Sequence, residues 1–200
     1  MLPYMIIFFI VLLAYLIGSI SSAIIISTLM KLPDPRTSGS GNPGATNVLR
    51  VGGKRAGLLT LLGDTLKGFI PVFLTIHFHL PDAFVALIAV AAFLGHLYPV
   101  FFRFKGGKGV ATCFGTLLAI NPLLALAVLG IWALIFAVFR YSSLAALTAV
   151  AIGLIYGWGA LPEPLYMAFF VMGIFLFWRH RSNIERLLKA KEPKFGRANA

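Results

Sequence analysis

The residues best suited to chemistry in this sequence of 200 residues lie in two glycine-rich segments that also carry cations. The first reads T-S-G-S-G-N-P-G-A-T-N-V-L-R, from Thr37 to Arg50. Glycines at alternate positions permit positive φ angles, which turn backbone N–H groups toward an anion. Hydroxyl and amide side chains add neutral donors, and the guanidinium of Arg50 is a planar fork that suits phosphate. We interpret this segment as an anion-binding loop rather than a flexible turn, which would need neither the repeated Asn nor the Arg.

The second segment runs from Gly95 to Thr112 and contains K-G-G-K-G at positions 105–109. Compact lysine charges and backbone freedom directly before an expected helix suit a phosphate bound at a helix N-terminus. The spacing differs from the G-x-x-x-x-G-K-[ST] loop of nucleotide-binding proteins, so ATP is not implied. His96, near the end of the preceding apolar run, is either a packing residue or part of a site.

A third basic segment, W-R-H-R-S-N-I-E-R-L-L, follows the last apolar run at positions 178–188. His180 and Asn183 are three residues apart, so a helix would place them on one face. Glu185 lies among arginines, and we expect it to pair with Arg181 and brace the helix. A basic helix beside a membrane also meets anionic lipid headgroups, so charge alone does not make it a site. A smaller patch, R-Y-S-S, includes Ser142.

The elements that hold these segments must be membrane helices, because the composition suits no water-soluble globule. Hydrophobic residues make up 60% of the chain, charged residues only 12%, and the mean hydropathy is +0.93. A soluble domain is roughly 45–50% apolar and about 25% charged, and one core could not bury this excess. The single cysteine, Cys113, excludes a disulfide scaffold. The net charge of +11 therefore belongs to a chain whose main solvent is the bilayer.

We predict an all-α integral membrane protein, a single polytopic domain over residues 1–200 with seven transmembrane helices. A crossing needs about 20 apolar residues, so the fourth predicted helix is short for a full span. The N-terminus is expected outside and the C-terminus in the cytoplasm, where the glycine-rich loops form the site. The predicted spans cover about residues 2–30, 56–78, 83–102, 110–120, 122–139, 142–160 and 164–178.

The distribution of cations decides the number of crossings. A tight helical hairpin at Asn121-Pro122 places every Lys and Arg except Lys67, 16 of the 17, on one side. This agrees with the positive-inside rule. A single crossing through 110–139 would instead place Arg140 and the basic C-terminal segment outside, against that rule.

Lys67 lies inside the second predicted span, three residues after Asp64. The two charges share a helix face and can neutralise each other. The pair is either a structural ion pair that faces the bundle or the edge of a site, since ionisable residues in membrane spans are often functional.

Three motifs carry a resemblance to a known family. They are S-G-S-G-N-P-G-A-T-N, then G-H-x-x-P-V-F-x-x-F-K-G-G-K-G-V-A-T, then H-R-x-N-I-x-R-L. In order and spacing they resemble the bacterial acyl-phosphate:glycerol-3-phosphate acyltransferases, the PlsY family, over nearly the whole chain. The resemblance implies a seven-helix enzyme of the bacterial inner membrane with its active site on the cytoplasmic face. It implies transfer of a fatty acyl chain from acyl phosphate to the sn-1 hydroxyl of glycerol 3-phosphate, giving lysophosphatidic acid and phosphate, the first step of phospholipid synthesis.

The resemblance also assigns roles to residues. The family's essential Ser and Arg correspond to Ser40 and Arg50, its His and Asn to His180 and Asn183, and its structurally important Glu to Glu185. Lys108 joins the first four as an expected catalytic residue. Substrate-binding positions are expected at Ser38, Gly41, Asn42, Thr46, Asn47, His96, Lys105, Gly106, Gly107, Gly109, Thr112 and Ser142.

The implied reaction needs no metal or other cofactor, because acyl phosphate is a mixed anhydride and already activated. The implied partners are glycerol 3-phosphate, fatty acyl phosphate, membrane lipids and a soluble acyl-phosphate synthase that supplies the donor, with no nucleic acid. The hydroxyl proton goes either to His180 or to a departing phosphate oxygen, and we favour the phosphate. Ser40 is favoured as a phosphate-binding hydroxyl over an acyl-enzyme nucleophile.

Two other functions compete with this interpretation. A transporter of organic phosphates would also need cationic glycine-rich loops, but it should place charge near the bilayer midplane, where only Asp64 and Lys67 lie. A CDP-alcohol phosphotransferase would need a carboxylate-rich metal motif, which the sequence lacks. His77 and Asp82 match the H-x-x-x-x-D spacing of other glycerolipid acyltransferases, yet they fall on the predicted outer side, and we interpret the match as chance. The tail after Glu192 reads as poorly ordered or partly added for expression.

Overall fold

The computed structural model describes residues 2–196, and within that range it contains nine α-helices, one short 3-10 helix and no strand. The all-α prediction is therefore confirmed for the described residues. The elements are α1 (Leu2–Gly18), α2 (Ser22–Leu29), α3 (Ala45–His77), α4 (Asp82–Leu97), η1 (Val100–Phe102), α5 (Val110–Ile120), α6 (Pro122–Phe139), α7 (Ser142–Ala160), α8 (Glu163–Arg179) and α9 (Arg181–Leu188).

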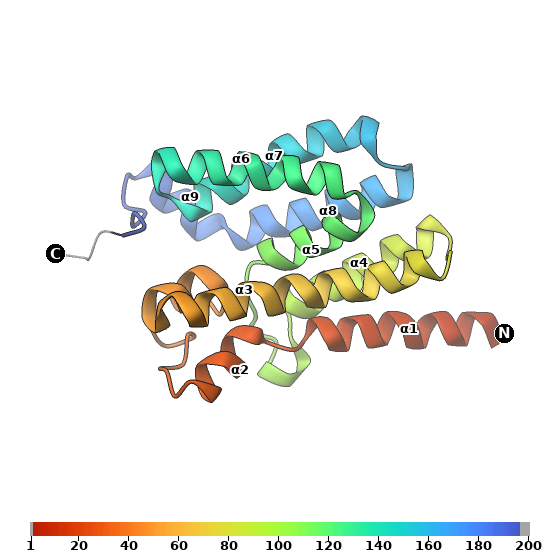
Figure 1. Ribbon diagram of the computed structural model, residues 1–200, viewed down its shortest axis with the longest axis horizontal. Helices are drawn as coiled ribbons and strands as arrows, with labels where there is room; N and C mark the ends of the chain where they lie inside the picture. Colours follow the sequence, from red (N-terminus) through yellow and green to blue (C-terminus); the bar gives the residue numbers. More distant parts are fainter. Residues whose placement is uncertain (1, 197–200) are drawn as a thin grey trace.

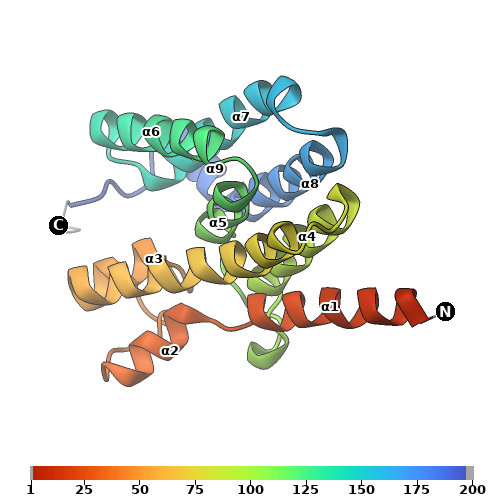
Figure 2. The ribbon, with the colours of Figure 1, turned by 45° about the vertical axis from the view of Figure 1, so that its right-hand side comes forward.

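The long helices run side by side, and the two ends of the chain lie at opposite ends of the bundle (Figure 1). The short helix α5 lies in the middle, between α3 and α4 on one side and α6, α7 and α8 on the other (Figure 2). Helix α3 packs mainly on α5, α1 on α4, and α6 on α7. The three glycine-rich or basic segments are thus attached to helices that surround α5.

Four helices or helix pairs of the described residues are long and apolar enough to cross a membrane, and the bent pair α1 and α2 makes a fifth. Helices α5, α6 and α7 coincide with the predicted ranges 110–120, 122–139 and 142–160. Helix α5 has only 11 residues and α8 has 17. At about 1.5 Å per residue neither covers a hydrocarbon core of about 30 Å as a straight helix.

The predicted span over residues 2–30 contains two helices, α1 and α2, rather than one straight helix. The helix breaks after Gly18, and α1 and α2 meet at an angle of 44°. A side chain on Gly18 would collide with the carbonyl group of Ala92, so α1 lies directly against the backbone of α4 at this point. The hydroxyl of Ser21 then accepts a hydrogen bond from the N–H of Ile24 and starts α2 as its N-cap. Two local features therefore end one helix and begin the next.

The helix that contains the second predicted span, 56–78, begins earlier, at Ala45, so residues 45–50 are helical and not part of the predicted loop. Gly53 interrupts this helix with φ 81° and ψ −179°, a conformation that is essentially restricted to glycine. The kink separates a short helical piece, residues 45–52, from the long part of α3. Arg50 and Thr46 lie on this short piece, so the kink sets the direction in which they point.

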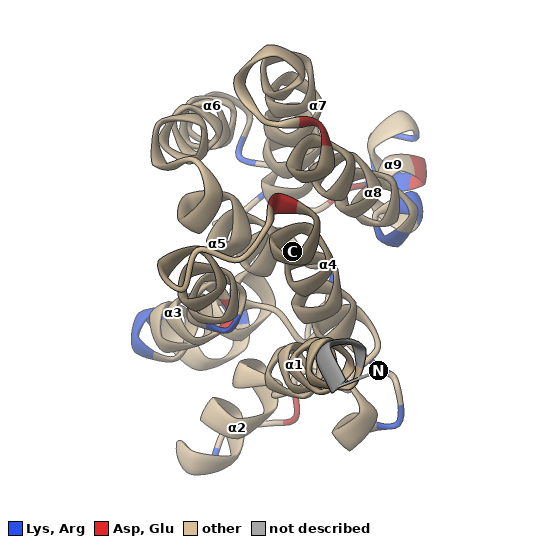
Figure 3. Ribbon diagram, turned by 90° about the vertical axis from the view of Figure 1, so that its right-hand side faces the viewer, with Lys and Arg blue, Asp and Glu red and all other residues tan. Residues whose placement is uncertain are grey.

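Lysine and arginine segments gather around α2, α3 and α9, whereas α1 and α6 carry none (Figure 3). Helices α1 and α6 are also the most apolar, and many of their large side chains are exposed on the outside of the bundle. An apolar surface of this size is suited to lipid rather than water. Most lysines and arginines therefore lie toward one end of the bundle, where α2, the start of α3 and α9 are found (Figures 1 and 3).

Candidate active site

A cavity of about 510 Å³ opens where α3, α5, α7 and α9 come together. One end of it is polar and the other is lined by apolar side chains of α5, α6, α7 and α8. The polar end contains eleven of the predicted site residues: Ser40, Asn42, Thr46, Asn47, Arg50, His96, Lys108, Gly109, Ser142, His180 and Asn183. Residues from three distant parts of the sequence thus meet in one place, as their chemistry indicated.

Three helices begin at this polar end. Helices α3, α5 and α7 start after Gly44, Gly109 and Tyr141, and none of these three residues caps its helix with a side-chain hydrogen bond. The N–H groups of a first helical turn have no partner within the helix and carry a partial positive charge. The polar end therefore combines cationic side chains with the helix N-termini that commonly bind phosphate.

The loop before α3 is held in shape by Asn47. Its side-chain amide donates to the carbonyl oxygens of Pro35 and Ser38, both at 2.9 Å, and its Oδ1 accepts from the Ser40 N–H at 2.8 Å. Asn47 is buried, and both of its amide hydrogens are used. It therefore fixes the loop that presents Ser40 to the cavity, while Ser38 contributes its carbonyl to that support and does not line the cavity.

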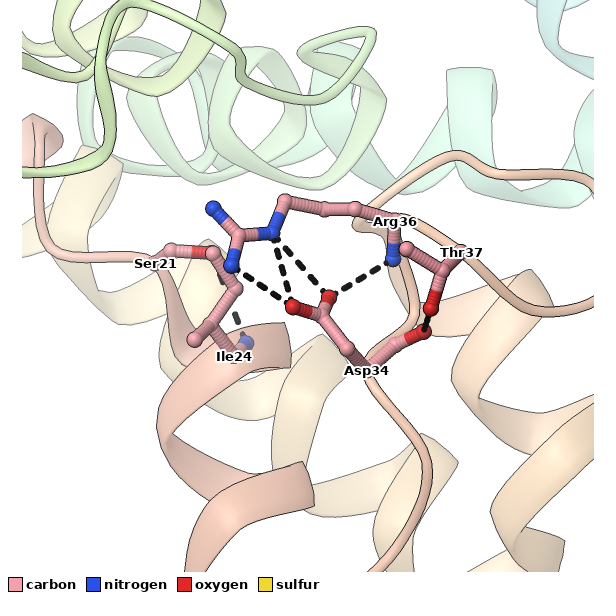
Figure 4. Close-up of polar contacts among 5 residues, drawn as sticks. All are labelled: Ser21, Ile24, Asp34, Arg36 and Thr37. Carbon is pink, nitrogen blue, oxygen red and sulfur yellow. Dashed lines mark hydrogen bonds and ion pairs between the residues drawn. The ribbon is translucent and has the colours of Figure 1, made fainter.

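A turn at Asp34 precedes this loop (Figure 4). The Asp34 carboxylate accepts hydrogen bonds from both the side chain and the backbone N–H of Arg36, and its carbonyl accepts from Thr37. The hydrogen bond from the Arg36 side chain holds the pKa of Asp34 below its ordinary value. Both side chains are substantially exposed, so this pair shapes the loop from outside the cavity.

The K-G-G-K-G segment passes directly over the end of α4. Side chains at Gly106 or Gly107 would collide with His96, with its backbone oxygen and with its imidazole ring respectively. The Arg179 guanidinium donates to the carbonyl oxygens of Gly106 at 2.8 Å and Gly107 at 3.1 Å. Gly109, with φ 88°, then turns the chain into α5. These glycines support the segment by packing, and of the five residues only Lys108 and Gly109 line the cavity.

The two lysines of this segment have different positions. Lys105 is exposed and does not line the cavity, so the structure separates it from the other predicted site residues. Lys108 lies in the cavity and donates a hydrogen bond to Oδ1 of Asn183. Burial lowers the pKa of Lys108 to about 8, an effect that Glu192 opposes and the neighbouring Arg186 strengthens.

Glu192 connects the cavity residues to one another. Its Oε1 accepts from the Asn183 amide and from the Ser143 hydroxyl, both at 2.6 Å, and its Oε2 accepts from Arg186 Nε at 2.7 Å. Burial alone would raise the pKa of Glu192, but these hydrogen bonds outweigh it and keep the pKa below its ordinary value. Glu192 was not predicted as a site residue, because it follows α9 in a segment with no motif.

The prediction that Glu185 braces α9 through Arg181 is wrong. Glu185 is exposed and binds Lys189 Nζ at 2.6 Å, one turn further along the helix. Arg181 instead lies over the ring of Trp178. The bracing carboxylate is Glu192, and a one-turn spacing rule could not have found it, because the chain must fold back after α9 to bring it there.

His180 is buried at the junction of α8 and α9. Its Nδ1 lies 2.9 Å from the carbonyl oxygen of Leu176, so in the neutral ring Nδ1 carries the proton and Nε2 is the acceptor. Burial and the nearby Lys108 lower the pKa of His180 to about 4. The imidazole is therefore neutral near pH 7 and is a weak base.

Two hydroxyl groups of the cavity wall also lie close together, since those of Thr46 and Ser142 are 3.1 Å apart.

The predicted ion pair in the second span is confirmed, with 2.8 Å between Lys67 Nζ and Asp64 Oδ1. Asp64 and His96 both line the cavity wall, and their side chains are 3.7 Å apart. Thr112 does not line the cavity. Its hydroxyl donates to the backbone oxygen of Asp64 at 3.0 Å. His77 and Asp82 lie at the end of α3 and the start of α4 and do not line the cavity.

The chain after α9 is more structured than expected. Pro193 and Phe195 line the cavity, and the N–H of Phe195 donates to the Arg140 carbonyl at 2.8 Å. Residues 193–196 thus have defined contacts with the bundle, and the rest of the tail lies outside the described residues.

The sequence and the fold both match known proteins. The family model described as glycerol-3-phosphate acyltransferase matches residues 8–190. A glycerol-3-phosphate acyltransferase of Methylobacillus flagellatus is 58% identical over 92% of this chain and 94% of its own length, and one of Burkholderia ambifaria is 53% identical over 92% and 89%.

The chain is also similar to crystal structures of PlsY (YgiH), an integral membrane glycerol 3-phosphate acyltransferase. The glycerol 3-phosphate form has a TM-score of 0.91 at 43% identity, covering 95% of this chain and 96% of that one. The lysophosphatidic acid form has a TM-score of 0.88 at 42% identity, covering 95% of each.

Proposed function

The chain belongs to the glycerol-3-phosphate acyltransferase family, and we propose that it transfers a fatty acyl chain from acyl phosphate to the sn-1 hydroxyl of glycerol 3-phosphate. The products are lysophosphatidic acid and inorganic phosphate. The same two small molecules, glycerol 3-phosphate and lysophosphatidic acid, give their names to the forms of the similar PlsY crystal structures. The reaction belongs to phospholipid synthesis, and the enzyme is an integral membrane protein.

The observation that carries this proposal is the two-sided cavity. Its polar end holds the cations Arg50, Lys108 and Arg186, and its only carboxylates among the described lining residues, Asp64 and Glu192, are engaged by basic side chains. Its other end is apolar, with Leu117, Val128 and Phe169 among its walls. A substrate pair with phosphate groups and one fatty chain fits both ends at once, and neither end alone would indicate an acyltransferase.

The reaction brings two anions together, which costs energy before any bond forms. Two unit charges about 4 Å apart repel by about 4 kcal/mol at an effective dielectric constant near 20. Lys108, Arg50 and the helix N-termini offset this repulsion and stabilise charge on the carbonyl oxygen and the departing phosphate. The hydroxyl of glycerol 3-phosphate attacks the acyl carbon, and the C–O bond to phosphate breaks.

A departing phosphate oxygen takes the hydroxyl proton in this proposal. His180 has a pKa of about 4 and is a weaker base than a phosphate dianion. Its neutral ring and the Asn183 amide then position glycerol 3-phosphate. Ser40 is exposed at the cavity mouth, where its hydroxyl binds phosphate without forming an acyl-enzyme.

The membrane arrangement that accompanies this activity has seven helices that cross or enter the membrane, with the N-terminus outside. The chain then lies in the inner membrane of a bacterium, and its cavity opens to the cytoplasm, which contains the water-soluble substrate glycerol 3-phosphate. The acyl phosphate comes from a soluble synthase, and its chain lies among membrane lipids. The basic end of the bundle supports this orientation, since cytoplasmic loops carry excess Lys and Arg.

One assay tests the proposal. Purified chain in detergent should release inorganic phosphate from palmitoyl phosphate only when glycerol 3-phosphate is present, with no added nucleotide. The organic product should be 1-acyl lysophosphatidic acid. No phosphate release, together with uptake of glycerol 3-phosphate into proteoliposomes, would favour the transporter instead.

A further inference from the structure

Asp64 lies where three segments of the chain meet inside the bundle. It is on α3, and its side chain is 2% exposed. Around it lie Lys67 on the same helix, His96 at the end of α4 and Thr112 in the first turn of α5, all buried. Lys67 contacts the break between α1 and α2, His96 contacts the K-G-G-K-G segment, and Thr112 follows that segment in the chain.

Each contact of Asp64 restrains a different part of the chain. Lys67 Nζ lies 2.8 Å from the Asp64 carboxylate and donates to the carbonyl of Ile20 at 2.7 Å, between α1 and α2. The Asp64 carbonyl accepts from Thr112 at 3.0 Å and so fixes the start of α5. The side chain faces His96, whose backbone oxygen accepts the Gly107 N–H at 3.2 Å.

His96 has one ring nitrogen without another partner. Among the residues that the structure describes, Nδ1 of His96 is buried and has no hydrogen-bond partner, and Asp64 Oδ1 is 3.7 Å away. The other edge of the ring lies against Gly107, where a side chain would collide with Nε2. The orientation of this ring therefore determines the room available to the glycine segment, and the Asp64 carboxylate, 3.7 Å from Nδ1, is the negative charge that faces the ring.

Simple charge neutralisation does not account for this arrangement. A buried ion pair adds little to stability relative to apolar residues of similar size. Two apolar side chains would serve α3 at least as well within a membrane, where ionisable residues are costly and typically functional. The contact of the Asp64 side chain with His96 supplies the missing role, because the His96 ring lies against the segment that presents Lys108.

We propose that the Asp64 side chain is a positioning residue for substrate phosphate: it orients His96, and the His96 ring in turn fixes the K-G-G-K-G segment in the geometry that binds the phosphate. This inference rests on the proposed function. Glycerol 3-phosphate depends on that geometry most, since it has no fatty chain to hold it. The apolar walls of the cavity retain acyl phosphate even when the segment shifts.

Two uncharged double variants separate positioning from neutralisation. Asp64→Leu/Lys67→Met removes both charges and the acceptor that faces His96, whereas Asp64→Asn/Lys67→Met removes both charges but keeps an oxygen acceptor. We expect the first to raise the KM for glycerol 3-phosphate about tenfold, because the His96 ring loses the carboxylate oxygen that faces it. We expect kcat and the KM for acyl phosphate to change less than twofold. The second should keep a KM within about threefold of the wild-type chain.

A third substitution tests whether Asp64 acts through His96. In the Asp64→Leu/Lys67→Met background, His96→Leu should add no further increase in KM, because the contact is already lost. Equal KM values for both double variants and the wild-type chain, or increases that multiply, would overturn the positioning role.

If the Leu/Met variant does not fold, as judged by gel filtration and thermal unfolding, His96→Leu alone must raise the KM by the same factor, and an unchanged KM overturns the inference. An inactive wild-type chain would contradict the proposed function itself, which keeps the two failures distinct.

Discussion

Two acid–base pairs in this chain have similar geometry and opposite surroundings. Arg36 Nη2 lies 2.6 Å from Asp34 Oδ2, and Lys67 Nζ lies 2.8 Å from Asp64 Oδ1. The side chains of the first pair are each 36% exposed, and those of the second 6% and 2%. Water screens an exposed pair, so its contribution is about 0–1 kcal/mol. Loss of one partner of a buried pair leaves a charge without water or counter-charge. Burial, rather than the distance between the charges, decides what each pair contributes.

The same contrast appears twice more among residues of one type. Lys105 and Lys108 share one glycine segment, but only Lys108 lines the cavity. Glu185 and Glu192 both accept hydrogen bonds from basic residues near the C-terminal end, but the side chain of Glu185 is 65% exposed and that of Glu192 is 8% exposed. Each set offers a test in which the exposed member is the control for the buried one.

The largest effect is expected at the buried pair. Lys67→Met leaves the Asp64 carboxylate without its counter-charge and the Ile20 carbonyl without its donor. We expect a loss of about 3–5 kcal/mol in the free energy of unfolding, measured by denaturant or thermal unfolding in detergent micelles.

The double variant Asp64→Asn/Lys67→Met is the control for that experiment. It removes both charges together, and most of the lost stability should return. A single variant as stable as the wild-type chain would show that the membrane interior tolerates the free carboxylate, and the comparison between the two pairs would fail.

Lys108→Met should cause the next largest change, in activity rather than in stability. Removing one preorganised charge from a site that stabilises developing negative charge typically lowers kcat/KM by about 10²- to 10³-fold. Lys105→Met, in the same segment but outside the cavity, should change it less than about twofold. The measurement is phosphate release at varied glycerol 3-phosphate concentration. Equal losses in both variants would place Lys105 in the site and contradict the arrangement described above.

Glu192→Gln should cost about 1–3 kcal/mol in unfolding free energy, because buried partners lose an ionised acceptor. Asn183 would also lose its restraint, so we expect a higher KM for glycerol 3-phosphate. Glu185→Gln, whose side chain faces solvent, should stay within about 0.5 kcal/mol of the wild-type chain. Thermal unfolding of the two variants side by side decides which carboxylate braces the site.

The sequence allowed the fold class and most of the polar end of the site to be predicted. The ranges of α5, α6 and α7 follow from apolar runs with Asn-Pro and Arg-Tyr-Ser breaks between them, which are local signals. The segments that hold Arg50, Lys108, His180 and Asn183 were recognisable because glycine-rich and cationic segments are unusual in so apolar a chain, whereas Ser40 was assigned by the family resemblance.

The failures come from contacts between distant residues. Near the helical start at Ala45, Leu49 lies against Gly57 across the kink, and Leu32, which precedes α3, lies against Gly52. Glu192 becomes a brace only after α9 turns the chain back toward Ser143. No pattern of local spacing contains that information, because the partners of these residues lie elsewhere in the chain.

The pH profile should report the burial of Lys108. Its pKa of about 8 lies below the ordinary value of 10.5, so the charge that binds phosphate is present below pH 8 and is lost above it. We expect kcat/KM to fall about tenfold for each pH unit above 8. The contribution of the same group to stability has the opposite sign. The unfolded chain binds more protons between pH 8 and 10.5, so this group makes stability rise with pH in that window. A profile that is flat to pH 9.5 would contradict the assignment of this charge to the site.

The smallest effect is expected at the exposed pair, where Asp34→Asn removes the charge but keeps an oxygen acceptor. Hydrogen bonds from the Arg36 side chain lower the pKa of Asp34. The pair therefore supports the turn at pH values above the ordinary carboxylate pKa, and this support is lost as the pH falls through the lowered pKa. We expect a cost below about 1 kcal/mol at low ionic strength, and less in 0.5 M salt, because exposed charges are screened. The Lys67→Met loss should not depend on salt in this way, since that pair is buried. Unfolding of both variants at two salt concentrations therefore measures burial directly, and an Asp34→Asn cost that equals the Lys67→Met cost and resists salt would show that the two pairs differ in position only.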